Sequence, residues 1–236
     1  MNTRLVLAAL LVLTGAQATA AELPHTTSQR ENATSLLVIS PIFNQLVAFK
    51  MPLSFHIANE ETSAHAYIRQ AVPKGETAEQ WTQMITVSGY KDVAVNSGPP
   101  PAVLINTIAS SFKKACPDTI SVMDLGNPPI DGYPAALAFV GCGAISGGGK
   151  THSKTALVLV IKGSQDYYSI QWAERGPAQA RPATFDKQKW ENRLGQLLPV
   201  FLCARIAGEK SPYPSCRSRL LSDDDSQAAT TDNSAI

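Results

Sequence analysis

Four segments rich in apolar residues lie between residues 120 and 174, and groups of turn-forming residues separate them. The turns are Gly-Asn-Pro-Pro at 126–129, Ser-Gly-Gly-Gly at 146–149 and Gly-Ser-Gln-Asp at 163–166. Apolar segments joined in this way are typical of antiparallel strands that follow one another in a sheet. The sequence therefore predicts a meander of the strands Ile120–Leu125, Ala135–Cys142, Thr155–Lys162 and Tyr167–Glu174.

The last of these segments shows a period of two. Tyr168, Ile170 and Trp172 alternate with Tyr167, Ser169 and Gln171, which predicts a strand with one buried and one solvated face. Strand patterns also precede the meander. They lie at 36–39, 45–51, 55–58 and 64–72, and Pro41 separates the first two.

Two amphipathic helices are predicted around these strands. The first follows the Ser97–Pro101 break and carries Ile105, Ile108, Phe112 and Ala115 on one face, until Pro117 ends it. In the second, apolar residues recur at helical spacing and Pro199 kinks the helix or marks its last turn. These residues are Trp190, Leu194, Leu197, Leu198 and Phe201. The expected fold is one α+β domain over residues 36–205, with a mainly antiparallel sheet packed against two principal helices.

The stretch from Val72 to Val87 is predicted to form a strand end, a turn at Lys74-Gly75 and a short helix. Thr77 and Gln80 have the spacing of a capping box, so the helix should begin at Ala78. Helical spacing then places Trp81, Met84 and Ile85 on one inward face. The charged residues that project outward are candidates for contact with a partner: Lys74, Glu76 and Glu79.

The amino terminus has the pattern of a secretory signal peptide. Arg4 precedes a short apolar run at 5–13, and Ala18-Thr19-Ala20 is a cleavage signal, so we expect residues 1–20 to be removed after Ala20. Residues 21–35 are predicted to be a flexible lead-in. No second long apolar run follows, so no membrane span is expected in the mature chain. The predicted location is the periplasm or, beyond it, the medium.

Four cysteines remain in the exported part of the chain: Cys116, Cys142, Cys203 and Cys216. An even number in an exported chain predicts two disulfides, for which three connectivities exist. The favoured pairing is Cys116 with Cys142 and Cys203 with Cys216. The second bond would tether residues 206–236, a tail that we expect to be disordered beyond about Leu221.

Charge excludes some classes of partner. The formal net charge is +1, and cleavage of the leader removes Arg4, so that acidic and basic side chains balance. This balance argues against nucleic acid as a partner and against electrostatic docking on membranes. The segment Ala144–Thr151 resembles a phosphate-binding loop, but the Val-rich and Ile-rich residues after it predict a strand, so the interpretation is a glycine-rich hairpin.

No catalytic residue, metal site or cofactor site is predicted. The histidines are scattered along the chain, at His25, His56, His65 and His152, and the cysteines lack zinc-type spacing. Three aspartates lie in or beside predicted turns and could bind calcium, although turn formation is the more common role of such residues. They are Asp124, Asp131 and Asp166. Trp81, Trp172 and Trp190 are expected in the core.

The phrase Val72-Pro-Lys-Gly-Glu, followed by Trp81-Thr-Gln-Met-Ile-Thr-Val87, resembles one found in small uncharacterised exported proteins of proteobacteria. The order of elements resembles the fold shared by photosystem subunit P and the Ran-binding Mog proteins. This resemblance implies an antiparallel sheet packed against helices and a role as an adaptor or binding module. It transfers no catalytic residue to this chain.

These observations lead to three functional hypotheses. The first is a non-enzymatic periplasmic protein that binds another protein, a toxin or a component of the envelope. Its most specific form is an immunity protein that neutralises a toxin directed at the periplasm. The second is a carrier of a small molecule or lipid, with a pocket between the sheet and the long helix. The third is a hydrolase whose site assembles in space from His56, His65 or His152.

Overall fold

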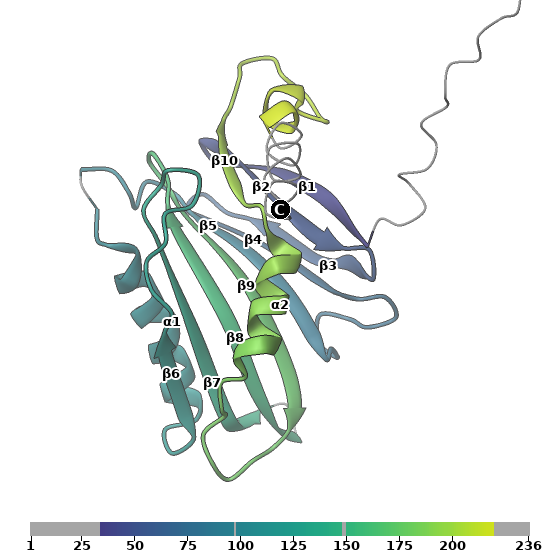
Figure 1. The fold of residues 1–236 in the computed structure, drawn as a ribbon, viewed down its shortest axis with the longest axis vertical. Helices are drawn as coiled ribbons and strands as arrows, with labels where there is room; N and C mark the ends of the chain where they lie inside the picture. Colours follow the sequence, from purple (N-terminus) through teal and green to yellow (C-terminus); the bar gives the residue numbers. More distant parts are fainter. Residues whose placement is uncertain (1–33, 97, 148–149, 220–236) are drawn as a thin grey trace, which may run out of the picture. The chain divides into compact units, whose positions relative to one another are not determined.

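The computed structural model describes residues 34–96, 98–147 and 150–219. The predicted signal peptide, nearly all of the lead-in and the end of the tail lie outside these residues. The described part contains ten strands, two longer helices, α1 (Pro101–Ala115) and α2 (Lys187–Leu197), and a short helix at 214–219. The strands form two antiparallel sheets (Figure 1). The predicted class, a mainly antiparallel sheet with helices, is confirmed.

The larger sheet has seven strands in the order β3-β4-β5-β9-β8-β7-β6. The predicted meander forms one half of it, and its two central strands are longer than the pattern indicated. Every neighbouring pair is antiparallel, and β5 joins the two halves by pairing along β9. The strands are β3 (Phe55–Thr62), β4 (Ala66–Pro73), β5 (Gln83–Tyr90), β6 (Ile120–Asp124), β7 (Ala135–Gly147), β8 (Lys150–Lys162) and β9 (Tyr167–Pro177).

The smaller sheet has the order β1-β2-β10, from β1 (Ser35–Ile42), β2 (Gln45–Pro52) and β10 (Phe201–Ala204). Strand β1 continues through Pro41 instead of ending before it. Proline has no N–H to donate and is tolerated on an edge strand. Because β1 pairs only with β2 within the described residues, Pro41 does not interrupt the sheet.

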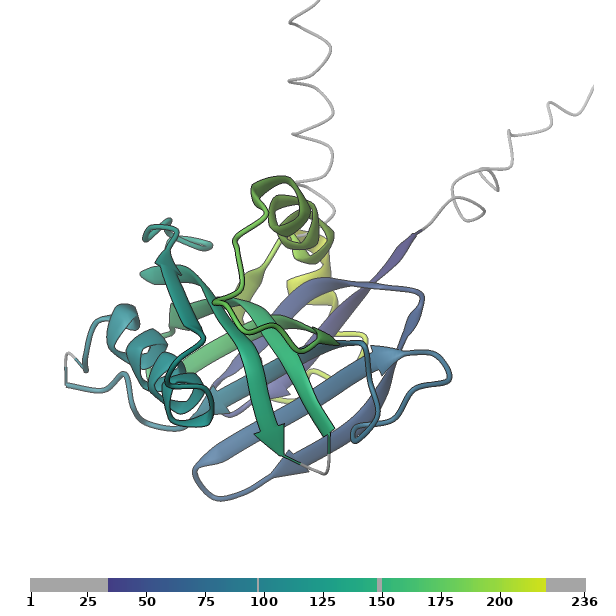
Figure 2. The same ribbon diagram turned by 90° about the horizontal axis from the view of Figure 1, so that it is seen from below.

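The two faces of the larger sheet are covered by different elements. One face packs against the smaller sheet and α2, and buries Phe49, Trp172 and Trp190. The other packs against α1, and buries Ile105 and Phe112. Figure 2 shows α1 and α2 on opposite sides of the sheet. The three predicted core tryptophans are all buried.

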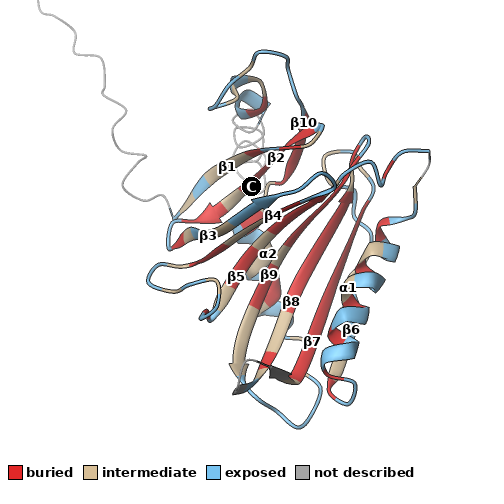
Figure 3. Cartoon of the chain, turned by 180° about the vertical axis from the view of Figure 1, so that it is seen from behind, coloured by how far each residue is buried: buried red, intermediate tan, exposed pale blue. Residues whose placement is uncertain are grey.

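Strand β9 is buried on both faces, contrary to the prediction of a solvated one. Tyr167 and Ser169 are 1% and 0% exposed, and the hydroxyl of Tyr167 donates to the carbonyl of Pro99. In the view from behind, buried residues run along β7, β8 and β9 (Figure 3). Alternation of polar and apolar residues predicted a solvated face, but the chain that leads into α1 covers it.

The predicted helix at Ala78 does not form. Thr77 does act as a cap, since its hydroxyl accepts from the N–H groups of Glu79 and Gln80. The chain then enters β5, and Met84 and Ile85 point to opposite faces of the larger sheet. A strand buried on both faces has consecutive apolar residues, and here their spacing from Trp81 also matched a helix.

The closing helix is shorter than predicted. It ends at Leu197, Leu198 is already extended (φ −79°, ψ 151°), and Phe201 lies in β10 opposite Ala48. Proline disfavours the helical conformation of the residue before it, so Pro199 stops the helix rather than kinking it. Phe201 is therefore buried on the outer face of the smaller sheet and not on a helix face.

Both predicted disulfides are confirmed. Cys116 at the end of α1 is bonded to Cys142 of β7, and Cys203 of β10 to Cys216 of the short helix. The second bond closes a separation of 13 residues and holds the segment after β10 against the outer face of the smaller sheet. Disulfides of this kind are typical of an oxidising compartment outside the cytoplasm.

Candidate functional site

The candidate site is an open groove beside β1, with a volume of about 520 Å³. One wall is the strand segment Leu36–Ile39. The other is the segment after β10, with Ser211, Pro212, Tyr213 and Arg217. The groove combines apolar side chains with an edge of the smaller sheet that pairs with no other described strand.

The free edge of β1 has a defined register. Ile42 and Gln45 close the two-residue turn to β2 and so form a hydrogen-bonded pair. Because such pairs alternate along an antiparallel ladder, Leu36, Val38 and Ser40 also bond to β2. The backbone N–H and C=O groups of Leu37 and Ile39 therefore point away from β2, and their side chains pack on the outer face that borders the groove.

A polar cluster fixes the inner side of β1 to the larger sheet. The guanidinium of Arg69 donates to the hydroxyl of Ser40 (2.6 Å) and to the carboxylate of Glu60 (2.8 Å). The hydroxyl of Tyr67 donates to the same carboxylate (2.8 Å). The bond from Arg69 lowers the pKa of Glu60, whereas burial and the bond to Glu60 raise the pKa of Tyr67. These contacts set the position of β1.

The opposite wall is held in place by covalent and ionic contacts. The Cys203–Cys216 disulfide joins the short helix to β10, and the carboxylate of Asp131 accepts from Leu202 N (3.1 Å). Asp131 also pairs with the guanidinium of Arg219 at 2.5 Å. Arg217 is exposed, and within the described residues its side chain forms no ion pair. The groove thus has two fixed walls and a cation at its rim.

The predicted contact residues Lys74, Glu76 and Glu79 lie elsewhere, in the loop between β4 and β5. The carboxylate of Glu76 accepts from the N–H and the hydroxyl of Thr82, both at 2.6 Å. The carbonyl of Glu79 accepts from the Arg175 guanidinium at 2.9 Å. Lys74 is exposed. The sequence placed Glu76 outward, but its carboxylate is used to close its own loop.

The aspartates considered for calcium accept hydrogen bonds from the protein. Asp124 accepts from Gly126 N at 2.8 Å, as a turn residue does. Asp166 is fully buried and accepts from the N–H groups of Asn44 (3.0 Å) and Asp92 (2.8 Å). Among the residues that the structure describes, no three His, Cys, Asp or Glu side chains are grouped as metal ligands would be.

Three of the four histidines are described, and they lie on different elements. His56 is on β3, His65 is in the turn before β4, and His152 is on β8. His25 lies outside the described residues. The glycine-rich segment that resembles a phosphate loop covers the end of β7 and the start of β8, and a strand follows it as predicted. Gly148 and Gly149 are outside the described residues.

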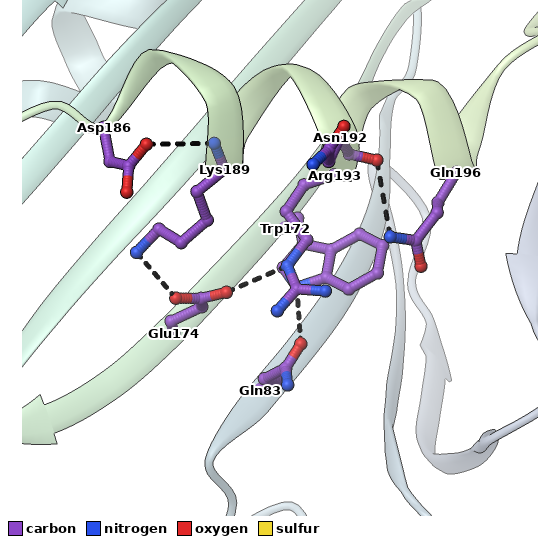
Figure 4. A network of polar contacts seen from close by, with 8 residues as sticks. All are labelled: Gln83, Trp172, Glu174, Asp186, Lys189, Asn192, Arg193 and Gln196. Carbon is purple, nitrogen blue, oxygen red and sulfur yellow. Dashed lines mark hydrogen bonds and ion pairs between the residues drawn. The ribbon is translucent and has the colours of Figure 1, made fainter.

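A network of polar contacts fixes α2 to the larger sheet (Figure 4). Glu174 of β9 accepts from Lys189 Nζ and Arg193 Nε, each at 3.0 Å. The guanidinium of Arg193 also lies over the ring of Trp172, whose indole N–H donates to Gln83 (3.1 Å). The carboxylate and both cations satisfy one another, and this network holds α2 in place.

Comparisons with known proteins identify no family. No family model matches the sequence, and a search of curated proteins finds no match. The described helices are too short or too polar to span a membrane: this holds for α1, α2 and residues 214–219.

Solved structures include proteins of similar fold. The Ran-binding protein Mog1p of Saccharomyces cerevisiae matches 70% of this chain and 86% of its own, with 12% identity and a TM-score of 0.37. A Pseudomonas aeruginosa protein of unknown function, PA94, matches 69% of this chain and 96% of its own, with 10% identity and a TM-score of 0.33. A Bacteroides thetaiotaomicron protein matches 70% of this chain and 47% of its own, with 14% identity and a TM-score of 0.29. At these values the similarity is one of fold alone.

Proposed function

We propose that this protein is a non-enzymatic binding protein, exported to the periplasm, that holds an extended segment of another protein along β1. The observation that carries the proposal is the groove of about 520 Å³ beside a strand edge whose outward backbone groups pair with no described strand. An extended peptide can add a strand to such an edge, where main-chain hydrogen bonds supply affinity and side-chain pockets supply specificity.

The walls of the groove define the chemistry of the partner segment. Leu37 and Ile39 offer an apolar surface, so the segment should carry apolar side chains at alternate positions. Arg217 at the rim lacks an ion pair in the described part of the chain, so an acidic residue beside the apolar ones would complement it. The proposed ligand is an extended, apolar segment with at least one carboxylate.

Export to the periplasm is supported by the signal-like leader and by the two disulfides. Within this setting we propose that the partner is a toxin or an envelope component. The specific form, an immunity protein, makes a distinct prediction: a neighbouring gene should encode a toxin, and purified protein should inhibit it at equimolar concentration. Full toxin activity in the presence of excess protein would contradict that form alone.

The partner can be found by placing a photo-reactive amino acid at Ile39 in living cells. Asn192, exposed on α2, is the matched control position. We expect an adduct with one protein from position 39 and none with that protein from position 192. Equal adducts from both positions, or none from position 39, would contradict the proposed site.

The purified partner then tests the mode of binding through two variants of one residue. Leu37→Pro removes an N–H of the free edge without removing a bond to β2, whereas Leu37→Ala removes most of the side chain and keeps the N–H. If a partner strand pairs with β1, Leu37→Pro should weaken binding by about tenfold or more beyond the effect of Leu37→Ala, as measured by titration calorimetry. Equal affinities of the two variants would exclude strand pairing.

The structure supports the two alternative functions less well. The space between the larger sheet and α2, where a carrier pocket was expected, is filled by Trp172, Trp190 and Phe139, whose rings pack on neighbours at 5.3–5.6 Å. The hydrolase hypothesis would require an activity that is lost on substitution of His56, His65 or His152, which lie on separate elements.

A further inference from the structure

Two cations lie opposite each other on the α1 face of the larger sheet. Lys154 of β8 and Arg175 of β9 are register partners, so their side chains leave the sheet on the same side. The next residue of β7 in this row is Cys142, which is bonded to the end of α1. At the other end of the row lies Thr82, in the loop after β4. Its carbonyl accepts a hydrogen bond from Arg175 N.

Aromatic rings flank both cations. The guanidinium carbon of Arg175 lies 3.9 Å from the centre of the Trp81 ring. Lys154 Nζ lies 5.8 Å from the same ring and 5.1 Å from that of Phe112. Both rings are almost fully buried, so they form a rigid wall against the two cations. Such contacts attract a cation but neutralise no charge.

The neighbouring carboxylates are engaged elsewhere. Glu174, next to Arg175 in sequence, points to the opposite face and pairs with Lys189 and Arg193. Glu76 is bonded to Thr82. Arg175 donates to the backbone carbonyl of Glu79, not to its carboxylate. The cation pair therefore has no anion of its own within the described residues.

Donors in this pair are also left without acceptors. The Nε atom of Arg175 is buried and has no hydrogen-bond partner, and Lys154 Nζ makes no hydrogen bond or ion pair in the described part of the chain. Burial, together with the charge of Arg175, lowers the pKa of Lys154. Buried donors normally have an acceptor. An added anion would offset the two like charges and accept hydrogen bonds from the unused donors.

We propose that Lys154 and Arg175 bind a small oxyanion, a carboxylate or phosphate group, against the wall formed by Trp81 and Phe112. The Arg175 guanidinium can donate to two oxygens and Lys154 can supply a third bond and a second charge. The bound group would be part of a small molecule or of a protein side chain or terminus. This site lies on other elements than the β1 groove and does not depend on it.

Titration of ¹⁵N-labelled protein followed by NMR tests the site directly. Sodium phosphate and sodium acetate are added in separate experiments at constant ionic strength, with chloride as the exchanged anion. We expect saturable shifts of the Arg175 Nε–H and Trp81 indole N–H signals with at least one of the two. Phosphate alone would identify a phosphate ligand, acetate alone a carboxylate, and both a general oxyanion site. Absence of saturation with both anions overturns the proposal.

Two lysine variants separate a site from general attraction to positive charge. Lys154→Met keeps a long apolar side chain against the two rings and should weaken the binding of the effective anion by about fivefold or more. Lys210→Met removes an exposed lysine in the loop after β10 and should leave the affinity unchanged. Circular dichroism confirms that each variant is folded. Equal affinity of wild type and Lys154→Met would overturn the proposal, whatever the result for the β1 groove.

Discussion

Glu174 and Arg175 are consecutive residues of β9, and they lie in two opposite electrostatic environments. On the α2 face, Glu174 stands between Lys189 and Arg193, so that one anion meets two cations and every partner is bonded. On the α1 face, Arg175 stands beside Lys154, so that two cations meet no described anion. The first arrangement fixes a helix. In the second, hydrogen-bond donors of Arg175 and Lys154 have no acceptor among the described residues, and we interpret the pair as a ligand site.

The helices on the two faces are also attached differently. Helix α2 is joined to the sheet by ion pairs and by packing on Trp172. Helix α1 is joined by the Cys116–Cys142 bond at its last turn and by the burial of Ile105 and Phe112. A covalent attachment does not depend on pH or salt. The α1 face can therefore keep an unbalanced pair of charges without losing its helix.

The largest expected effect comes from the packing under α2. Replacement of Trp172 by alanine should lower the free energy of unfolding by about 3–5 kcal/mol, because this side chain fills the centre of the core and is 1% exposed. Urea denaturation followed by circular dichroism measures the loss. Trp172→Phe is the control and should lose clearly less. A loss below about 1 kcal/mol for the alanine variant would mean that α2 does not depend on this contact.

Removal of the Cys116–Cys142 bond tests how α1 is attached. The double variant Cys116→Ser, Cys142→Ser should be destabilised by about 3.5 kcal/mol, the size expected for a loop of 26 residues. Under oxidising conditions, the double variant should have a lower midpoint of urea denaturation than wild type. Wild-type protein in which a reductant opens both disulfides should fall to the same midpoint or below it. A loss confined to reduced wild type would assign the effect to the other disulfide.

A smaller effect is expected at Glu174. Glutamine there leaves two cations without their anion, and the carboxylate is largely screened from water, so a loss of about 1–2 kcal/mol is expected in urea denaturation. Lys187→Gln breaks the exposed pair with Glu191 and serves as the control, with a loss of at most about 0.5 kcal/mol. Equal losses in the two variants would mean that the Glu174 network stabilises the fold no more than an exposed ion pair does.

At Lys154 we expect a substitution to raise the free energy of unfolding: Lys154→Met should be more stable than wild type at pH 7. Its folded-state pKa is lowered, so folding releases protons when the pH lies between that pKa and 10.5, the ordinary value. Wild type should therefore gain stability relative to Lys154→Met as the pH rises through this window, because the cost of the buried charge disappears. Urea denaturation of both proteins at pH 7 and pH 10 should show the difference shrinking. A difference independent of pH would mean that Lys154 carries no such cost.

Patterns along the chain predicted the positions of helices and strands better than they predicted which faces of these elements are buried. Helix α1, the meander and the number of disulfides follow from local periodicity, turn residues and cysteine count. The errors occurred where one pattern fits two structures. Trp81, Met84 and Ile85 match a helix face, yet two of them belong to a strand that is buried on both sides. Phe201 continues the helical spacing of Trp190 and Leu194, yet Pro199 had already ended the helix.

The two sites were not predictable from sequence patterns. Lys154 and Arg175 are 21 positions apart, and only the register of β8 and β9 makes them neighbours. Leu37 and Tyr213 line one groove because β10 and the Cys203–Cys216 bond hold the segment after β10 against the smaller sheet. The predicted contact residues Lys74, Glu76 and Glu79 nevertheless lie in the loop that carries Trp81 over Arg175.

The sequence by itself determined the class of the fold, the order of most elements and the number of disulfides, because these depend on short-range spacing and on the types of residue. Only the tertiary structure decided which strand edge borders the groove, which faces are covered and which charges lie side by side. These properties depend on contacts between residues far apart in the chain. Sheet register and the packing of the layers create such contacts, and no local pattern encodes them.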